Sequence, residues 1–247
     1  YIMSSAKGRH NAPLVKSRGR KAASIAGRSE EKQISSMKQT EEKYEVIPDG
    51  MNRFDRFTKR AFDILVSAVC LVAFSPLILF CYLAVKLEDG GPAVYKQERI
   101  GLHGKAFNIL KFRSMRIDAE DGGPKLSSGE TDNRLTKVGK MLREHHLDEL
   151  PQLWNVFRGD MAFIGPRPER QYYINKIMEK DNRYPNLYQI RPGVTSYATL
   201  YNGYTDTIEK MVNRLHYDLY YLQHRSWGLD CKILWMTFFN IVRGKKF

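Results

Sequence analysis

The longest apolar stretch of the chain runs from Ile64 to Val85 and contains 22 residues without a charged side chain. At a rise of about 1.5 Å per residue, a straight helix of this length would just cross a hydrocarbon core of about 30 Å. Ser75 and Pro76 lie at its middle, however, and proline has no N–H and clashes with the carbonyl four residues earlier. The pattern therefore predicts a helix that bends at Ser75 and Pro76.

Basic residues flank this segment on both sides. Arg53, Arg56, Lys59 and Arg60 precede it, and Lys86 follows it. Because basic flanks favour the cytoplasmic side of a membrane, the pattern favours a re-entrant helix that enters the bilayer, breaks and returns to the same side. A helix that spans the membrane and a buried helix of a soluble core are the alternatives.

After the apolar segment the periodicity changes from helical to alternating. Residues 93–101 and 105–112 alternate apolar and polar positions around a turn from Gly101 to Gly104, which predicts a small β-hairpin. Apolar residues then recur at helical spacing in two stripes, at 150–157 and 208–222, and both stripes predict helix faces packed in a core.

The tail from residue 229 to residue 247 mixes aromatic with basic side chains. It is too short and too charged to span a membrane, which favours an amphipathic helix at the level of the lipid head groups. Packing in a protein core is the alternative for this segment.

Composition divides the chain into three parts. Residues 1–53 are rich in polar and charged residues with little apolar periodicity, so we predict a disordered basic arm. Residues 54–90 form the predicted re-entrant helix, and residues 91–247 form one folded region that ends in an interfacial helix. The predicted fold class is an α/β membrane-associated (monotopic) domain with several amphipathic helices.

The formal net charge of +13 predicts anionic partners. Seven basic and no acidic side chains lie in the first 28 residues, which would attract this arm to anionic membrane lipids. A nucleic-acid-binding protein would use the basic surface and the tyrosines for phosphate and stacking contacts, but the apolar segment argues against nucleic acid as a partner. A membrane-tethered scaffold without catalysis is a further alternative.

Three clusters, at 111–121, 147–155 and 159–168, combine charged side chains with residues that restrict the backbone. In the first, Asp118, Glu120 and Asp121 lie within four residues, and carboxylates this close repel each other unless a cation offsets them. Mg²⁺ prefers such oxygen ligands together with substrate phosphates. One carboxylate could instead attack phosphorus and form an acyl phosphate. A helix that begins with Asp118 as its N-cap is the structural alternative.

The other two clusters contain further candidates. Arg167 lies between Pro166 and Pro168, and a guanidinium on such a restricted backbone suits bidentate phosphate binding. An exposed turn without function is the alternative. Asp148 and Glu149 precede a predicted helix and could simply be a capping pair for it.

Six motifs in this order resemble the catalytic domain of the monotopic phosphoglycosyl transferases, the bacterial sugar transferases that start glycoconjugate assembly. They are the apolar segment with Ser75 and Pro76, GGPAVYKQERIG, KFRSMRIDAE, LDELPQLWNV, GDMAFIGPRP and RPGVT. The resemblance covers residues 54–247, nearly four-fifths of the chain.

The resemblance implies that a sugar 1-phosphate moves from a nucleotide diphosphosugar, such as a UDP-sugar, to a polyprenyl phosphate, such as undecaprenyl phosphate. It also implies Mg²⁺, a covalent aspartyl-phosphosugar intermediate, and a place at the bacterial inner (cytoplasmic) membrane with the catalytic region on the cytoplasmic face. Capsule and exopolysaccharide assembly begin with such steps. The sugar stays open, since Ser196 and Thr199 replace a glycine and a glutamine of many relatives. The sequence also leaves open whether the protein forms a homo-oligomer.

Carried over to this chain, the resemblance makes Asp118 the nucleophile and Glu120 its partner at the metal. Because Ala119 separates these two acids, whereas small family members have adjacent Asp and Glu, Glu120 with Asp121 is the alternative pairing. Arg167 would bind the anionic part of the nucleotide sugar. The lesser substrate-binding candidates are Arg113, Arg134, Lys111, Asp148 and Glu149.

Overall fold

A computed structural model describes residues 44–119, 132–203 and 205–243 of the chain. The folded unit begins at Glu45, earlier than the boundary predicted after residue 53. Met51 is buried, and Ile47 donates its main-chain N–H to Asn186 at 2.9 Å and accepts from Gln189 at 2.9 Å. These contacts correct the predicted boundary, because residues 45–52 belong to the folded unit. Residues 1–43, the rest of the predicted arm, lie outside the described residues.

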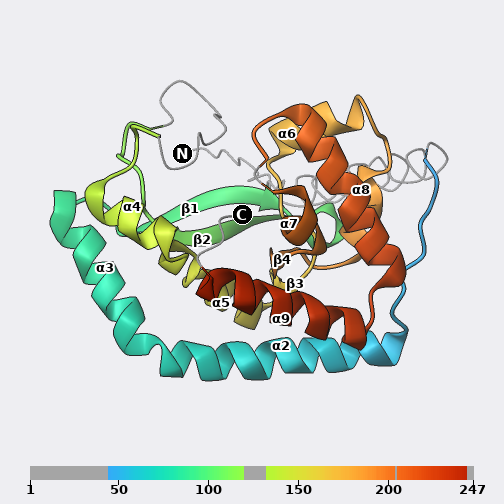
Figure 1. The fold of residues 1–247 in the computed structure, drawn as a ribbon, viewed down its shortest axis with the longest axis horizontal. Helices are drawn as coiled ribbons and strands as arrows, with labels where there is room; N and C mark the ends of the chain where they lie inside the picture. Colours follow the sequence, from blue (N-terminus) through green and yellow to red (C-terminus); the bar gives the residue numbers. More distant parts are fainter. Residues whose placement is uncertain (1–43, 120–131, 204, 244–247) are drawn as a thin grey trace, which may run out of the picture. The chain divides into compact units, whose positions relative to one another are not determined.

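Two helices that meet at an angle of 64° form the predicted apolar segment (Figure 1). They are α2 (Arg53–Ala73) and α3 (Ser75–Asp89). Pro76 has no N–H to donate to the carbonyl of Val72, and the hydroxyl of Ser75 donates to that carbonyl instead, at 2.8 Å. The predicted bend is therefore confirmed. Within the described residues, only the bent pair taken together has the length and composition of a membrane segment, and no single helix has them.

The faces of α2 are reversed relative to those of a helix in a soluble protein. Lys59, Asp63 and Ser67 are its buried residues. Its large apolar side chains point outward, and those of α3 continue this surface. The most exposed are Phe54, Phe57, Leu65, Val69 and Val72 in α2 and Leu79, Phe80, Leu83 and Leu87 in α3. An exposed apolar surface of this kind is typical of a membrane or protein interaction site.

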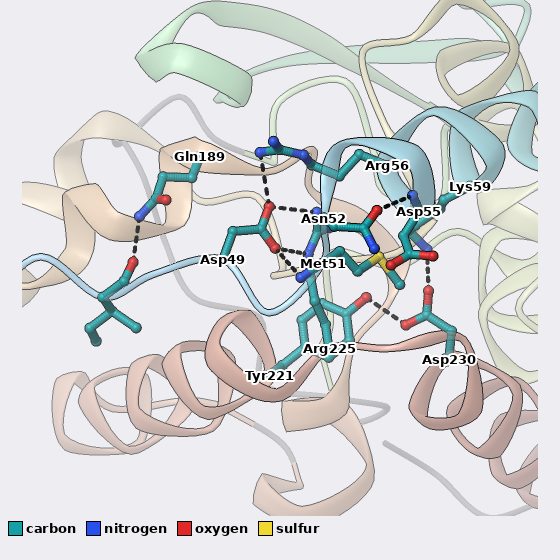
Figure 2. Close-up of polar contacts among 11 residues, drawn as sticks. Asp49, Met51, Asn52, Asp55, Arg56, Lys59, Gln189, Tyr221, Arg225 and Asp230 are labelled. Carbon is teal, nitrogen blue, oxygen red and sulfur yellow. Dashed lines mark hydrogen bonds and ion pairs between the residues drawn. The ribbon is translucent and has the colours of Figure 1, made fainter.

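Buried polar contacts fasten α2 and the residues just before it to the C-terminal part of the chain, which contains α8 (Ile208–His224) and α9 (Trp227–Val242) (Figure 2). The Lys59 ammonium lies 2.6 Å from Asp230 of α9, and the hydroxyl of Tyr221 donates to the other oxygen of this carboxylate at 2.7 Å. Asp49, just before α2, accepts two hydrogen bonds from Arg225, at 2.6 and 2.8 Å. Each pair joins segments far apart in the sequence.

The same part of α2 also binds the middle of the chain. The guanidinium of Arg60 donates to the carbonyls of Val156 at 2.6 Å and Phe157 at 2.8 Å, and the carboxylate of Asp63 accepts the main-chain N–H of Phe163 at 3.2 Å. Lys59 and Arg60 were among the charges expected to orient this helix in a membrane. The structure shows that both also bind the protein itself.

The strands form two small sheets, so the unit is mixed α/β (Figure 1). β1 (Val94–Ile100) and β2 (Ala106–Phe112) form the predicted antiparallel hairpin, with Tyr95 opposite Lys111. The turn between them contains His103 and Gly104, both with positive φ. β3 (Ala162–Ile164) and β4 (Gly193–Thr195) form a separate parallel pair.

The remaining helices pack around these strands (Figure 1). They are α4 (Lys137–Glu144), α5 (Gln152–Arg158), α6 (Gln171–Met178) and α7 (Tyr197–Asn202), with short 3₁₀ helices η1 (Leu102–Gly104), η3 (Leu147–Glu149) and η4 (Tyr184–Gln189). The predicted stripe on α8 is confirmed, since Met211, Leu215, Leu219 and Leu222 are buried.

The predicted stripe on α5 is wrong as a core face. Trp154 and Phe157 are 47% and 37% exposed, whereas Gln152 and Asn155 are buried. The reason is a pair of hydrogen bonds to β2. Asn155 accepts the main-chain N–H of Leu110 at 3.0 Å and donates to the carbonyl of the strand residue two positions earlier at 2.8 Å. The polar face of α5 therefore turns to the protein, as in α2.

Helix α9 packs on the core, as the alternative for the tail predicted, and its place at the level of the lipid head groups stays a prediction. Asp230 and Ile233 are buried against the rest of the unit, and Trp235, Phe238 and Ile241 are exposed. The helix thus packs on the core with one side and presents aromatic and aliphatic side chains on the other.

We predict that Lys59→Met destabilises the unit by about 3–5 kcal/mol, because Asp230 would keep a buried charge without its cation. Chemical unfolding in detergent measures the loss. Arg56→Met is the matched control one turn earlier. Its guanidinium is 45% exposed and lies 3.3 Å from Asp49, so it should cost less than about 1 kcal/mol. Equal losses in the two variants would contradict the importance of the buried pair.

Candidate active site

Residues from all three predicted clusters meet beside the hairpin. Lys111 lies near the end of β2, and its ammonium is 2.6 Å from the carboxylate of Glu149 in η3. Arg167, in the loop that follows β3, is close enough to Glu149 to influence its ionisation. The fold therefore brings together three segments that are separated in the sequence.

The two adjacent acids of this site have pKa values shifted in opposite directions. Burial raises the pKa of the Asp148 carboxyl, and Lys111 only partly offsets this effect. Burial acts on Glu149 in the same sense, but the charges of Lys111 and Arg167 and the hydrogen bond from Lys111 outweigh it and hold its pKa at about 2. Neither acid caps α5, whose N-cap residue is Pro151. The capping interpretation is therefore wrong.

Arg167 is exposed, whereas Pro166 and Pro168 on either side of it are buried. Within the described ranges, its guanidinium has no hydrogen bond or ion pair with the protein. The flanking prolines restrict the backbone, so the loop presents an unpaired cation with five N–H donors. This arrangement suits a phosphate group, which accepts two parallel hydrogen bonds from a guanidinium.

The loop of Arg167 is held by close main-chain contacts with the RPGVT segment. Gly165 donates its N–H to the carbonyl of Thr195 at 3.2 Å, and Gly193 donates to the carbonyl of Pro166 at 2.9 Å. A Cβ atom on Gly165 would lie 2.2 Å from the carbonyl oxygen of Arg191. Glycine is needed there because the two backbones approach so closely.

Asp118 lies in a turn after β2, where its carboxylate is 62% exposed and 3.6 Å from the guanidinium of Arg116. The residues of a helix that Asp118 would cap lie largely outside the described ranges, so the N-cap interpretation is not tested. Glu120 and Asp121 lie outside the described residues, and the structure does not test their pairing. Among the described residues, no cluster of three His, Cys, Asp or Glu side chains could hold a metal. An exposed carboxylate such as Asp118 nevertheless fits Mg²⁺, which commonly uses one or two carboxylates together with substrate phosphates.

Two further arginines predicted for phosphate binding are paired with carboxylates. Arg113 is buried and makes two hydrogen bonds with Asp89 at the end of α3, one of them at 2.8 Å. Arg134 binds Asp132 at 2.5 and 2.7 Å. Arg113 thus connects the apolar helix to the segment that leads to Asp118.

Comparison with known proteins decides the family. Residues 54–244 match the family model described as bacterial sugar transferase. The chain belongs to the bacterial sugar transferase family. The resemblance inferred from the six motifs is therefore confirmed.

Three relatives of this bacterial sugar transferase show how the similarity extends. A UDP-glucose:undecaprenyl-phosphate glucose-1-phosphate transferase of Caulobacter vibrioides is 43% identical over 185 residues, which are 72% of this chain and 67% of the relative. A protein of the same name from Klebsiella pneumoniae is 39% identical over 192 residues, which are 77% of this chain and 41% of the relative. A UDP-N-acetylgalactosamine-undecaprenyl-phosphate N-acetylgalactosaminephosphotransferase of Aeromonas hydrophila is 36% identical over 188 residues, with 76% and 44% covered. The chain spans less than half the length of the last two.

The bacterial sugar transferase also contains a polar row on β1 that was not predicted. Gln97 donates to the hydroxyl of Tyr95 at 3.1 Å and accepts from Arg99 at 3.1 Å. Strand alternation could have indicated this row, because Tyr95 pairs with Lys111 and shares its face of the hairpin. Arg99 also pairs with Glu169, which lies outside the strand. Because Glu169 is distant in the sequence, no local pattern could have predicted this pair.

We predict that Lys111→Met destabilises this bacterial sugar transferase by about 2 kcal/mol at pH 7, because Glu149 loses its charged hydrogen-bond donor. The depressed pKa of Glu149 stabilises the folded state above its ordinary pKa of 4.5, and this contribution is lost as the pH falls toward 2. Unfolding at pH 7 and pH 3 should therefore show a smaller difference between variant and wild type at pH 3. Lys105→Met, exposed at the turn of the hairpin, is the control. A cost that does not depend on pH would contradict the prediction.

Proposed function

We propose that this protein transfers a sugar 1-phosphate from a UDP-sugar to a polyprenyl phosphate, such as undecaprenyl phosphate, and so starts capsule, exopolysaccharide or other glycoconjugate assembly. The main support is Arg167, an exposed and unpaired guanidinium on a restricted loop beside Lys111 and Glu149. The names of the relatives, which combine a UDP-sugar with undecaprenyl phosphate, support the same reaction.

Both substrates fit the chemistry of the surface. The donor is soluble and anionic, and the net charge of +13 favours its approach. The acceptor is a lipid with a phosphate head group, and the outward apolar side chains of α2, α3 and α9 would hold the protein where that head group lies. A single site could thus receive the two substrates in turn.

The reaction proceeds in two displacements at one phosphorus atom. The carboxylate of Asp118 attacks the phosphorus that carries the sugar, the bond from this phosphorus to the bridging oxygen breaks, and UMP leaves. An oxygen of the polyprenyl phosphate then attacks the same phosphorus, and the bond to Asp118 breaks, which regenerates the carboxylate. The exposure of Asp118 supports this role, because both attacks need open access.

Arg167 binds the diphosphate of the donor and stabilises the negative charge that develops on the leaving phosphate. Glu120 would hold Mg²⁺ together with Asp118, with Glu120 and Asp121 as the alternative pair. The bound ion would supply positive charge to the diphosphate and so assist the departure of UMP. Lys111 and Glu149 hold one another beside Arg167 and orient the nearby end of the hairpin.

We further propose that α2 and α3 enter the bacterial inner membrane from the cytoplasmic face and return to it. The 64° bend supports a re-entrant path, as does the donation from Ser75 to Val72, because a free carbonyl is costly in hydrocarbon. The catalytic region would then lie on the cytoplasmic face, where nucleotide sugars are available. The basic residues of the first 28 positions would add attraction to anionic lipids.

We predict that Arg167→Ala lowers kcat/KM for UMP release about 100-fold, because charged hydrogen bonds of about 1.5–3 kcal/mol are lost. Arg167→Lys keeps the charge but loses the fork, so it should lose about tenfold. The assay follows UMP release from a panel of UDP-sugars with undecaprenyl phosphate in detergent. Arg158→Ala is the control, since that side chain is 66% exposed and lies at the end of α5. If Arg167→Ala matches this control, Arg167 does not bind the donor.

We predict that the wild-type protein, mixed with its UDP-sugar in the absence of lipid, gains the mass of one sugar phosphate, and that Asp118→Asn gains none. Intact mass spectrometry after rapid quenching makes the measurement. Asp206→Asn removes a half-exposed carboxylate and should leave the adduct unchanged. An adduct on the Asp118→Asn protein would exclude Asp118 as the nucleophile, and Asp121→Asn would then test the alternative pairing.

A further inference from the structure

Two partly buried arginines share the carboxylate of Glu169, which lies in the same loop as Arg167. Glu169 accepts from Arg99 of β1 at 3.3 Å on one oxygen and from Arg214 of α8 at 2.5 Å on the other. Arg99 also donates to the carbonyl of Pro168 at 3.0 Å. The loop is therefore tied to both the hairpin and α8, and these three side chains together have one positive charge in excess.

Asp218 lies one turn after Arg214 on α8 and is only 2% exposed. Its carboxyl group accepts the main-chain N–H of Arg167. Its Oδ1 atom has no hydrogen-bond partner in the part of the chain that the structure describes. Burying a carboxyl group with one unpaired oxygen costs free energy. A structural or functional role must therefore account for Asp218 at this position.

We propose that Asp218 is a positioning residue that fixes the main chain at Arg167 and thereby orients its guanidinium toward the phosphates of the donor. This inference rests on the proposed function for the identity of the ligand. No motif in the sequence marks Asp218, because it lies in the middle of an amphipathic helix, and only the fold places it under the loop.

The electrostatics of the cluster add a dependence on pH. Burial raises the pKa of Asp218 to about 8, although Arg214 on the same helix and the N–H of Arg167 act in the opposite direction. Glu169 from the loop and Tyr184 from η4 are the other titratable groups that face it. At neutral pH the carboxyl is therefore protonated, and the excess positive charge of Arg99 and Arg214 is available to the ligand. Above pH 8 the ionised Asp218 cancels this excess.

Calorimetric titration of the full chain in detergent with UDP, from pH 7.5 to 9.5, tests the proposal. The phosphates of UDP are already ionised in this range, since their last pKa is about 6. Wild-type affinity should fall at least fivefold across the range. Asp218→Asn keeps an acceptor for the Arg167 N–H and cannot ionise, so it should bind like wild type at pH 7.5 and show no fall. Asp218→Ala loses the acceptor and should bind about tenfold more weakly at pH 7.5.

Two controls separate positioning from general stability. Asp206→Asn removes an exposed carboxylate just before α8 and should keep the wild-type pH dependence. Thermal unfolding without ligand gives an independent measure of the Asp218 charge. Because the folded pKa lies above the unfolded one, wild-type stability should fall relative to Asp218→Asn as the pH rises from 4 to 8.

If the affinity of Asp218→Asn for UDP falls with rising pH as much as that of the wild type, the inference is overturned. Equal UDP binding by folded Asp218→Ala and Asp218→Asn would also overturn it. If UDP binds with the expected pH dependence but no UMP is released from any UDP-sugar, the proposed function fails and the positioning role stands. If wild type does not bind UDP at all, both are overturned.

Discussion

The reversed polarity of α2 is the constraint on which the rest of the structure depends. Because its apolar side chains point outward, its polar side chains face the protein and must find partners there. Lys59 pairs with Asp230, Arg60 binds the end of α5, and Asp63 accepts the N–H of Phe163. The partners of these three side chains join the N-terminal, central and C-terminal segments of the unit into one body.

This body places charged groups at the junction of the bent helices and the hairpin. Arg113 ties the end of α3 to the segment that continues to Asp118, and Lys111 on the same strand holds Glu149. Most cations near the site are therefore balanced by a carboxylate. Arg167 differs, because its guanidinium is exposed and has no such partner within the described residues. A site in which the neighbouring cations are paired with carboxylates and one guanidinium is free suits an anionic ligand of defined geometry.

The restricted loop behind this guanidinium depends on main-chain contacts more than on side chains. Gly165 and Gly193 bring two motifs so close that a Cβ atom on either would meet backbone atoms at 2.2 Å. Glu169, held by Arg99 and Arg214, fastens the far end of the same loop. The orientation of the ligand-binding residue is thus set by strand pairing on one side and by buried charges on the other.

Much of this protein was determined by its sequence alone. Proline chemistry and the charge-free stretch predicted the bend at Ser75 and Pro76, and the alternation of residues predicted the hairpin, because these are local effects of backbone geometry. Six ordered motifs identified the family. The restricted backbone around Arg167 could also be predicted from the sequence, since the two prolines are its direct neighbours.

Only the tertiary structure decided which charges are free and which helix faces are buried. Lys111 could not be assigned to Glu149, nor Lys59 to Asp230, because the partners are far apart in the sequence. The outward face of α5 was mispredicted for the same reason, since the strand that its polar face binds lies elsewhere in the chain. Apolar periodicity reveals that a helix has two faces, but the environment of each face is set by contacts that no local pattern encodes.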